Sequence, residues 1–198
     1  MNEICLSLVS HAQTDLANRL LDDLGKYCHD IDVIFTSNIA EVVELDFSRW
    51  PRVKHIRNPT PKGFGANHNA AFKNCRAKYF CVVNPDIRLH SNPFPDLLAL
   101  AQGSEVGVVA PKVLNASGNT EDSVRFFPTP FGIFKKALSI GDGRYPIKGT
   151  QPLTVDWAAG MFLLFRAEAF DAIGGFDENF FMYYEDVDIC RRIWRGGG

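Results

Sequence analysis

Short apolar runs alternate with amphipathic segments along the first half of the chain. Four runs are rich in β-branched and aromatic side chains, which predicts buried strands at residues 4–10, 31–36, 53–57 and 79–83. Between the first two runs, Thr14 is expected to cap a helix with one apolar face, made by Leu16, Leu20, Leu21, Leu24 and Cys28. A second helix is expected from about Phe64, after a rigid loop at residues 58–63. This order is typical of an α/β protein with a mostly parallel sheet and helices on both faces.

The second half of the chain is less regular. The pattern predicts a helix over residues 93–100 and a strand over residues 106–110. Glycines, prolines and aromatics then favour a hairpin and a loop, with a short helix near 131–138. An apolar run follows at 154–165, and helices are expected at 167–173 and 185–194. In the first half, a short extended segment is also expected at 42–47.

Composition points to one globular domain. The chain has 198 residues, 46% hydrophobic and 22% charged, which suits a single domain with a full core. The net charge of −2 gives no sign of a nucleic-acid surface. Five scattered cysteines without a C-x-x-C pair predict reduced, buried thiols in a cytosolic protein. No signal peptide or membrane span is expected, and the glycines at 196–198, directly after a helical pattern, suggest a truncated protein.

The motif Asn84-Pro85-Asp86 ends the fourth predicted strand. Pro85 cannot donate to a sheet, so the strand must stop there and leave Asp86 at its carboxyl end. Ligands of open α/β sheets bind at that edge, although Asn-Pro-Asp is also favourable turn chemistry. A single carboxylate there fits Mg²⁺ or Mn²⁺, which bind through one or two carboxylates and substrate phosphates.

The loop at residues 62–69 opens the second helix with two glycines. Its free N–H groups favour an anion, yet it matches neither a dinucleotide fingerprint nor a P-loop. A plain helix start is the alternative interpretation. Asn67 and Asn69 count against that alternative, because asparagines form helices poorly.

A segment dense in aromatics and carboxylates, residues 174–188, begins the last helix. Glu185 and Asp186 at the start, with arginines at the end, suit the helix dipole, and Asp188 can pair with Arg191 or Arg192. The carboxylates are therefore explained by capping and ion pairs alone. Alternatively, neighbouring aromatics desolvate one carboxylate and raise its pKa, which suits a general base. The helix N-terminus opposes that shift, and the sequence leaves the balance open.

In this order and spacing, the motifs resemble the family 2 glycosyltransferases of the GT-A fold. The similarity is strongest to the bacterial rhamnosyltransferase-like branch that builds O-antigen, lipopolysaccharide and other surface polysaccharides. It covers the chain from the first strand to the last residue and rests on residues 63–69, 84–86, 156–160 and 174–188.

The resemblance implies one GT-A domain, with a Rossmann-like nucleotide-sugar-binding half (about 1–110) and an acceptor half (about 111–198). It implies inverting, metal-dependent transfer of a sugar from a nucleoside diphosphate sugar, dTDP-rhamnose or a UDP-sugar, to a saccharide hydroxyl. The acceptor would be lipid-linked, and the enzyme cytoplasmic, in contact with the inner face of the plasma membrane.

The resemblance also assigns roles to residues. Asp86 would anchor Mg²⁺ or Mn²⁺ on the diphosphate, Asp186 would be the catalytic base, and Glu185 would place the acceptor or orient that base. The substrate-binding residues would be Asn38 near the nucleobase, Lys62, Gly63, Gly65, Asn67, Asn69 and Asn84 on the nucleotide side, and Trp157 and Gly160 around the sugar and acceptor.

The chain departs from the family pattern in three places. Ser37-Asn38 stands where an aspartate-asparagine pair is common, and Ser10-His11 follows the first strand in place of a proline. A histidine that often completes the metal site lies beyond the last helix in relatives, after the end of this chain.

Two other functions were weighed. One is a non-catalytic remnant that binds nucleotide sugars. The other is a nucleotidyltransferase, which would need a glycine-rich basic loop after the first strand. Residues 10–13, Ser-His-Ala-Gln, supply no such loop.

Overall fold

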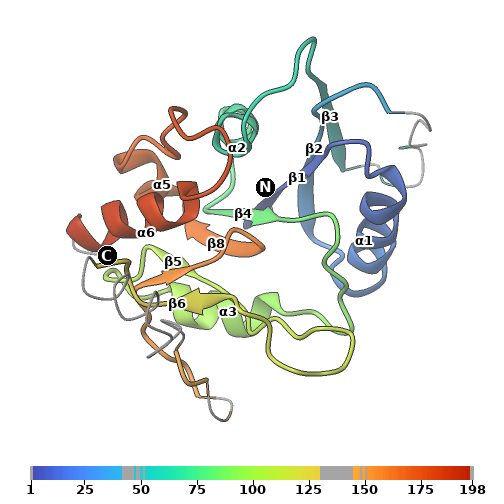
Figure 1. Ribbon diagram of the computed structural model, residues 1–198. Helices are drawn as coiled ribbons and strands as arrows, with labels where there is room; N and C mark the ends of the chain where they lie inside the picture. The colour runs from blue at the N-terminus through green and yellow to red at the C-terminus, as the bar shows by residue number, and fades with distance from the viewer. Residues whose placement is uncertain are drawn as a thin grey trace.

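A computed structural model describes residues 2–41, 47, 50, 52–129, 145–147, 149 and 151–196. Its main sheet has the strand order β3-β2-β1-β4-β8-β5 (Figure 1). The strands are β1 (Ile4–Ser10), β2 (Ile31–Ser37), β3 (Val53–Arg57), β4 (Tyr79–Val83), β5 (Val108–Val109) and β8 (Phe162–Arg166). Strands β1 to β4 are parallel, and β8 runs antiparallel to β4 and β5. The mostly parallel sheet predicted from the sequence is confirmed.

Helices cover both faces of this sheet, as predicted. One core cluster joins α1 (Thr14–Tyr27) and α3 (Phe94–Ala101) to the sheet, and β1 contributes Leu6 and Leu8 to it. The opposite cluster joins α2 (Phe64–Phe72), α5 (Ala167–Ala172) and α6 (Glu185–Arg195) through residues such as Cys5. Alternate β1 residues thus face opposite cores, as strand geometry requires.

One local prediction was wrong, and two other segments differ in extent from the elements expected. Thr14 is the first helical residue and not the cap, because its hydroxyl donates to Glu41 Oε2 at 2.7 Å and Gln13 occupies the cap position. The run at 154–165 is interrupted by a turn at Gly160 and Met161, which separates β7 (Trp157–Ala158) from β8. The strand at 106–110 shrinks to β5, since only Val108 and Val109 pair with β8.

The irregular region contains the expected hairpin as a bridge between Leu114 and Thr120. Nearby, β6 (Val124–Arg125) pairs with β7 in a small antiparallel sheet. The extended segment predicted at 42–47 falls outside the described residues except for Phe47, and the helix near 131–138 falls outside them entirely.

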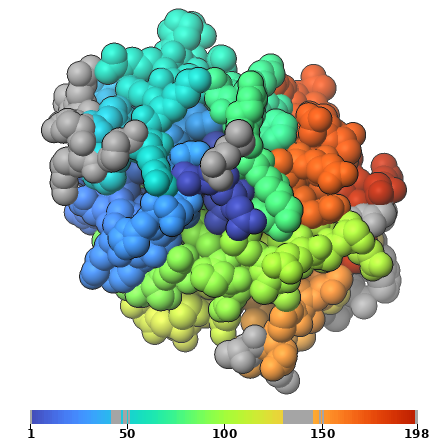
Figure 2. Space-filling model, turned by 180° about the vertical axis from the view of Figure 1, so that it is seen from behind, coloured from blue at the N-terminus to red at the C-terminus, as the bar shows by residue number. Residues whose placement is uncertain are grey.

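All five cysteines are buried, as predicted. Seen from behind, the N-terminal segments in blue and cyan gather on one side and the C-terminal segments in orange and red on the other (Figure 2). Among the described residues, no helix combines the length and apolar character needed to span a bilayer.

Candidate active site

An asparagine network joins the carboxyl end of β2 to the loop before α2. Asn38 accepts the Lys62 backbone N–H at 2.8 Å and donates to the Lys62 carbonyl at 2.9 Å. Asn58 donates to Oδ1 of both Asn38 and Asn67, at 2.9 and 2.6 Å. Asn67 is buried and donates to the carbonyls of Lys62 and Gly63. These amides therefore fix the shape of the loop, so a ligand at Asn38 would meet a side chain already engaged.

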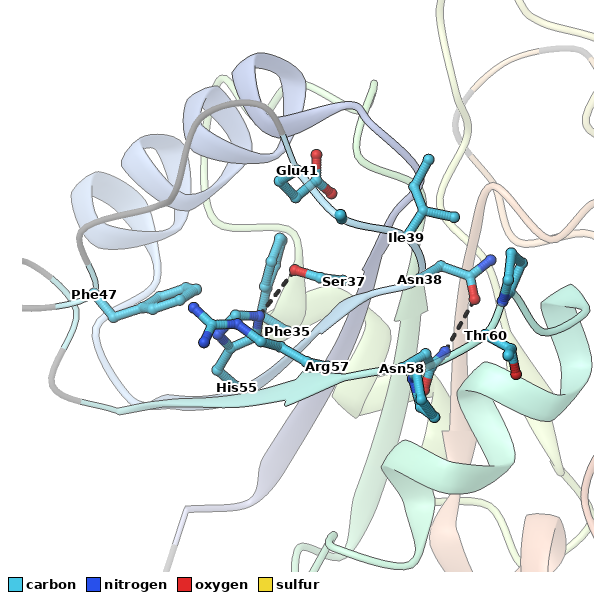
Figure 3. Close-up of a pocket in the computed structure, with 13 residues that line it drawn as sticks. Phe35, Ser37, Asn38, Ile39, Glu41, Phe47, His55, Arg57, Asn58 and Thr60 are labelled. Carbon is cyan, nitrogen blue, oxygen red and sulfur yellow. Dashed lines mark hydrogen bonds between the residues drawn. The ribbon is translucent and has the colours of Figure 1, made fainter.

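A pocket of about 400 Å³ opens beside this network, at the carboxyl ends of β2 and β3 (Figure 3). Phe35 and His55, whose ring centroids lie 5.4 Å apart, line it together with Arg57 and Glu41. The pocket lies next to Asn38, on the side of the sheet for which the sequence predicts nucleotide binding. It does not include the carboxylates of α6.

The glycines at the start of α2 are in close contact with the segment before α6. A Cβ on Gly63 would lie 2.6 Å from the carbonyl oxygen of Phe181, and one on Gly65 would lie 2.7 Å from Cβ of Phe176. The Phe64 N–H donates to that same Phe181 oxygen at 3.1 Å. Small residues are thus required here by packing between two distant parts of the chain.

Asn69 secures the same contact from inside α2. Its Oδ1 accepts the Phe176 N–H at 2.9 Å, and its Nδ2 donates to the Phe176 carbonyl at 2.8 Å and to Glu178 at 3.0 Å. The side chain therefore pairs with the backbone of a residue 107 positions away. In the described structure Asn69 joins α2 to the C-terminal segment.

Glu185 and Asp186 start α6 in partly dehydrated positions. Glu185 is 7% exposed, and its Oε2 has no hydrogen-bond donor among the described residues. Asp186 accepts the Gly160 N–H at 3.2 Å and the Val187 N–H at 2.8 Å. Burial raises the pKa of both carboxyl groups, against the lowering effect of the backbone donors. The sequence left open whether desolvation or the helix N-terminus has the larger effect on the pKa of these carboxyl groups. In the structure desolvation has the larger effect.

The ion pairs of α6 lie further along the helix. Asp188 pairs with Arg192 at 2.7 Å, which is one of the two pairings predicted from the sequence. Arg192 also donates to the carbonyls of Ile173 and Gly175. These contacts hold α6 against the preceding turn and leave Glu185 and Asp186 outside the ion pair.

A short chain of hydrogen bonds connects Asp186 to the end of β4. Asp186 binds the N–H of Gly160, and the next residue, Met161, accepts the Asn84 N–H at 2.9 Å. Asn84 precedes Pro85 and Asp86. The two motifs, 100 residues apart in sequence, are therefore joined at one end of the β4–β8 pair.

Asp86 is an exposed residue of the site. Its carboxylate makes no hydrogen bond or ion pair with the described residues, and those residues contain no cluster of three His, Cys, Asp or Glu that could hold a metal ion. A single free carboxylate does not form a closed metal site. It does fit a hard cation that completes its shell with diphosphate oxygens and water.

Trp157 and Gly160 have different positions around the turn between β7 and β8. A Cβ on Gly160 would lie 3.0 Å from the ring of Phe64, so this glycine also serves the contact with α2. The Trp157 indole donates to the Phe126 carbonyl at 3.1 Å, and neighbouring Asp156 accepts the Phe127 N–H and the Tyr145 hydroxyl. Trp157 is therefore engaged with the β6 side of the turn.

Sequence patterns did not single out several of the residues that shape the site. Asn58 lies in the predicted loop, and nothing local marks it as the link between Asn38 and Asn67. His68 is buried and hydrogen-bonded to Ser7 at 2.8 Å, and burial lowers its pKa to about 3. The sequence places His68 on the apolar face of the helix, but it does not indicate that the imidazole is neutral.

Comparison with protein families identifies the family of this chain. A family model described as Glycosyl transferase family 2 matches residues 35–174, from β2 to the turn after α5. The chain belongs to glycosyl transferase family 2. The family predicted from the motifs is thereby confirmed.

Named relatives of this family 2 chain include surface-glycan enzymes. It is 28% identical over 208 residues to rhamnosyltransferase WbbL of Escherichia coli (strain K12), which covers 98% of this chain and 78% of WbbL. It is 30% identical over 135 residues to the N-acetylglucosaminyl-diphospho-decaprenol L-rhamnosyltransferase of Mycobacterium tuberculosis (strain ATCC 25618 / H37Rv), covering 59% of this chain and 41% of that protein. The rhamnosyltransferase branch suggested by the motifs is supported by these relatives.

Solved structures confirm the GT-A fold. The crystal structure of GalNAc-T7 with UDP, GalNAc and Mn²⁺ superposes on the whole of this chain with a TM-score of 0.76 at 16% identity. The chain spans 41% of the length of that protein. At this identity the similarity establishes the fold alone.

Proposed function

We propose that this family 2 domain transfers a sugar from a nucleoside diphosphate sugar to a saccharide hydroxyl, with inversion at the anomeric carbon. The observation that carries the proposal is the connection from Asp186 through the Gly160–Met161 turn to Asn84. It joins the partly buried carboxylate of Asp186 to the strand end that presents Asp86. A base and a diphosphate anchor are the two groups that such a transfer needs at one site.

Asp186 is the proposed general base. The N–H groups of Gly160 and Val187 orient its two oxygens, and burial raises the pKa of the carboxyl, which makes the carboxylate a stronger base. It accepts the proton of the acceptor hydroxyl as that oxygen bonds to the anomeric carbon. The bond from this carbon to the diphosphate breaks on the opposite side, which inverts the configuration.

Asp86 is the proposed ligand of Mg²⁺ or Mn²⁺, with the substrate diphosphate supplying further oxygens. The cation would neutralise charge that develops on the leaving diphosphate. The carboxylate of Asp86 is exposed and has no partner among the residues that the structure describes, which supports this role. The network around Asn38 and Lys62 would shape the nucleotide side of the site, and the Gly160 turn the acceptor side.

The names of the relatives motivate the choice of substrates. WbbL is named a rhamnosyltransferase, which favours dTDP-rhamnose as donor ahead of a UDP-sugar. The mycobacterial relative's name specifies a decaprenol-linked N-acetylglucosamine acceptor, which favours a lipid-linked saccharide and peripheral contact with the inner face of the membrane. The division into donor and acceptor halves near residue 110 belongs to the same proposal.

A nucleotide screen tests the donor side. Melting temperatures are measured with dTDP, UDP and GDP, each with and without Mn²⁺, for the unmodified chain and for Asp86→Ala. A nucleotide at about 100 times its Kd should raise the Tm by roughly 5–10 °C in a Mn²⁺-dependent way. The Asp86→Ala variant should lose this shift, whereas the control Asp171→Ala, an exposed carboxylate on α5, should keep it.

Two outcomes would count against the proposal. Equal stabilisation of the Asp86→Ala variant would remove Asp86 from the metal site. Nucleotide binding without any sugar transfer, across donors and acceptors, would instead support the non-catalytic remnant.

A further inference from the structure

Four consecutive side chains project from the surface directly before α6. This aromatic run consists of Phe181, Met182, Tyr183 and Tyr184, whose exposed fractions are 62%, 60%, 73% and 63%. Large apolar side chains that are exposed together on a protein surface often mark a binding surface.

The backbone of the run adopts a conformation that tyrosine disfavours. Tyr183 and Tyr184 both have φ of 71°, in the left-handed region that favours glycine. Neither hydroxyl has a hydrogen-bond partner among the described residues, and the exposed rings gain little packing. The fold thus bears the strain without compensation from these side chains, a combination that is found at ligand sites.

The run is fixed at both ends. The Phe181 carbonyl accepts the Phe64 N–H at 3.1 Å and sits against Gly63, while the Tyr184 carbonyl accepts the Asp188 N–H at 2.9 Å. The tyrosine backbone is therefore anchored between α2 and α6 (Figure 1). The run directly precedes Glu185 and Asp186 in the sequence, so a ligand resting on the rings would lie near the start of α6.

Charge selects the kind of ligand. Residues 176–188 contain five carboxylates and no Lys, Arg or His: Asp177, Glu178, Glu185, Asp186 and Asp188. This segment repels phosphates and anionic lipid headgroups. A neutral sugar suits it, because the C–H face of the ring stacks on an aromatic side chain and its hydroxyls donate to carboxylates. Glu178 is exposed, so its carboxylate can accept such hydroxyls at the surface.

We infer that the aromatic run is a stacking platform for a neutral sugar ring of the acceptor, with Tyr183 and Tyr184 as its contact residues. The inference rests on the proposed glycosyl transfer and specifies how the acceptor is recognised. It also explains why tyrosine occupies two positions that glycine would fill with less strain.

The test measures sugar binding separately from donor binding. Methyl glycosides of neutral hexoses and N-acetylhexosamines, methyl N-acetyl-β-D-glucosaminide among them, are titrated by saturation-transfer NMR against the 198-residue chain. The double variant Tyr183→Gly/Tyr184→Gly removes the rings and relieves the backbone strain. It should weaken sugar binding about five- to tenfold, the loss expected for an aromatic contact, without a lower Tm.

Two controls separate stacking from other effects. The double variant Tyr183→Phe/Tyr184→Phe retains the rings and should bind sugar within about twofold of the unmodified chain. Leu153→Ala removes an unrelated exposed apolar side chain, 51% exposed, and should change nothing. Mn²⁺-dependent binding of dTDP or UDP should be equal in all variants, because the platform serves the acceptor.

Three results would overturn the platform. The first is undiminished sugar binding in the glycine variant, and the second is no binding of any glycoside by the unmodified chain. The third comes from a parallel measurement of binding to vesicles of phosphatidylglycerol and phosphatidylethanolamine: the glycine variant loses vesicle binding but keeps sugar binding. The last result would assign the run to the membrane surface. Failure of nucleotide binding would contradict the proposed function instead, so the two failures are distinguishable.

Discussion

The carboxylate of Asp23, on α1, accepts two hydrogen bonds from the Arg88 guanidinium, at 2.6 Å from Nε and 2.9 Å from Nη2. It also accepts the Leu89 N–H at 3.0 Å. The Arg88 guanidinium holds the pKa of Asp23 below its usual value. Because Arg88 lies two residues after Asp86, this ion pair anchors the turn that carries the proposed metal ligand to a helix 65 residues earlier.

We expect Asp23→Asn to disturb the Asp86 turn. The variant loses the charge of the carboxylate and one of its two acceptor oxygens, and should be about 1–3 kcal/mol less stable. If the pair orients Asp86, the variant should also bind Mn²⁺ with UDP or dTDP about tenfold more weakly, as for other supports of metal ligands. Isothermal titration calorimetry at saturating nucleotide measures this, at a temperature where the variant is fully folded.

The matched control for Asp23 is Asp15→Asn. Asp15 is exposed in the first turn of the same helix, so its loss should cost less than about 1 kcal/mol through the helix dipole. Metal affinity should be unchanged in this control. Unchanged metal affinity in Asp23→Asn as well would limit the ion pair to a stabilising role.

Gly63→Ala should destabilise the docking of the C-terminal segment on α2. The new methyl group would meet the Phe181 carbonyl, which is backbone and cannot rotate away. Overpacking of this kind costs about 1–3 kcal/mol. Urea unfolding measures the loss, and Gly25→Ala in α1, where the methyl would lie 3.7 Å from the Trp50 ring, should be neutral or stabilising. Equal stability of the two variants would show that α2 and the segment move apart easily.

Glu185→Gln should stabilise the protein at alkaline pH. Burial, and then the neighbouring Asp186 charge, raises the pKa of Glu185, so the folded state favours the protonated acid. That contribution to stability is present below the ordinary glutamate pKa of about 4.3 and is lost as pH rises through the raised pKa. Neutral glutamine removes the penalty, so its Tm should exceed that of the unmodified chain at pH 8.

The same variant provides its own control at acid pH. At pH 4 both side chains are largely neutral in the folded state, so the two Tm values should converge. A Tm deficit for Glu185→Gln of the same size at both pH values would mean that the carboxylate is stabilised in the fold.

The central strands were predictable because each is marked by its own local pattern. The β4 run from Tyr79 to Val83 is apolar throughout and ends at Pro85, and the structure has the strand at those residues. The position of β8 between β4 and β5 depends on pairing between residues about 80 positions apart, such as Val83 with Phe162. No local pattern encodes that partner. The Thr14 hydroxyl was misassigned for the same reason, since its acceptor is distant Glu41.

In the candidate site, too, residues marked by their local sequence were predicted, whereas contacts with distant parts of the chain were not. Glu185 and Asp186 stand out in sequence because they begin a predicted helix and directly follow large apolar residues. The expected cause of their raised pKa was different, however: the side chains at 181–184 are exposed, and the burial arises where α6 meets the Gly160 turn. The asparagines at 38, 67 and 69 were noticed as polar positions, but their backbone partners became visible only in three dimensions.

The most direct test of the proposed transferase is Asp186→Asn assayed for transfer and for nucleotide binding in parallel, with Asp188→Asn as a control on the same helix. The account predicts that Asp186→Asn lowers kcat by about 10²–10⁴ while Mn²⁺-dependent binding of the donor nucleotide stays within about twofold. Asp188→Asn should retain most activity, because its carboxylate pairs with Arg192. Transfer by Asp186→Asn at the rate of the unmodified chain would contradict the account.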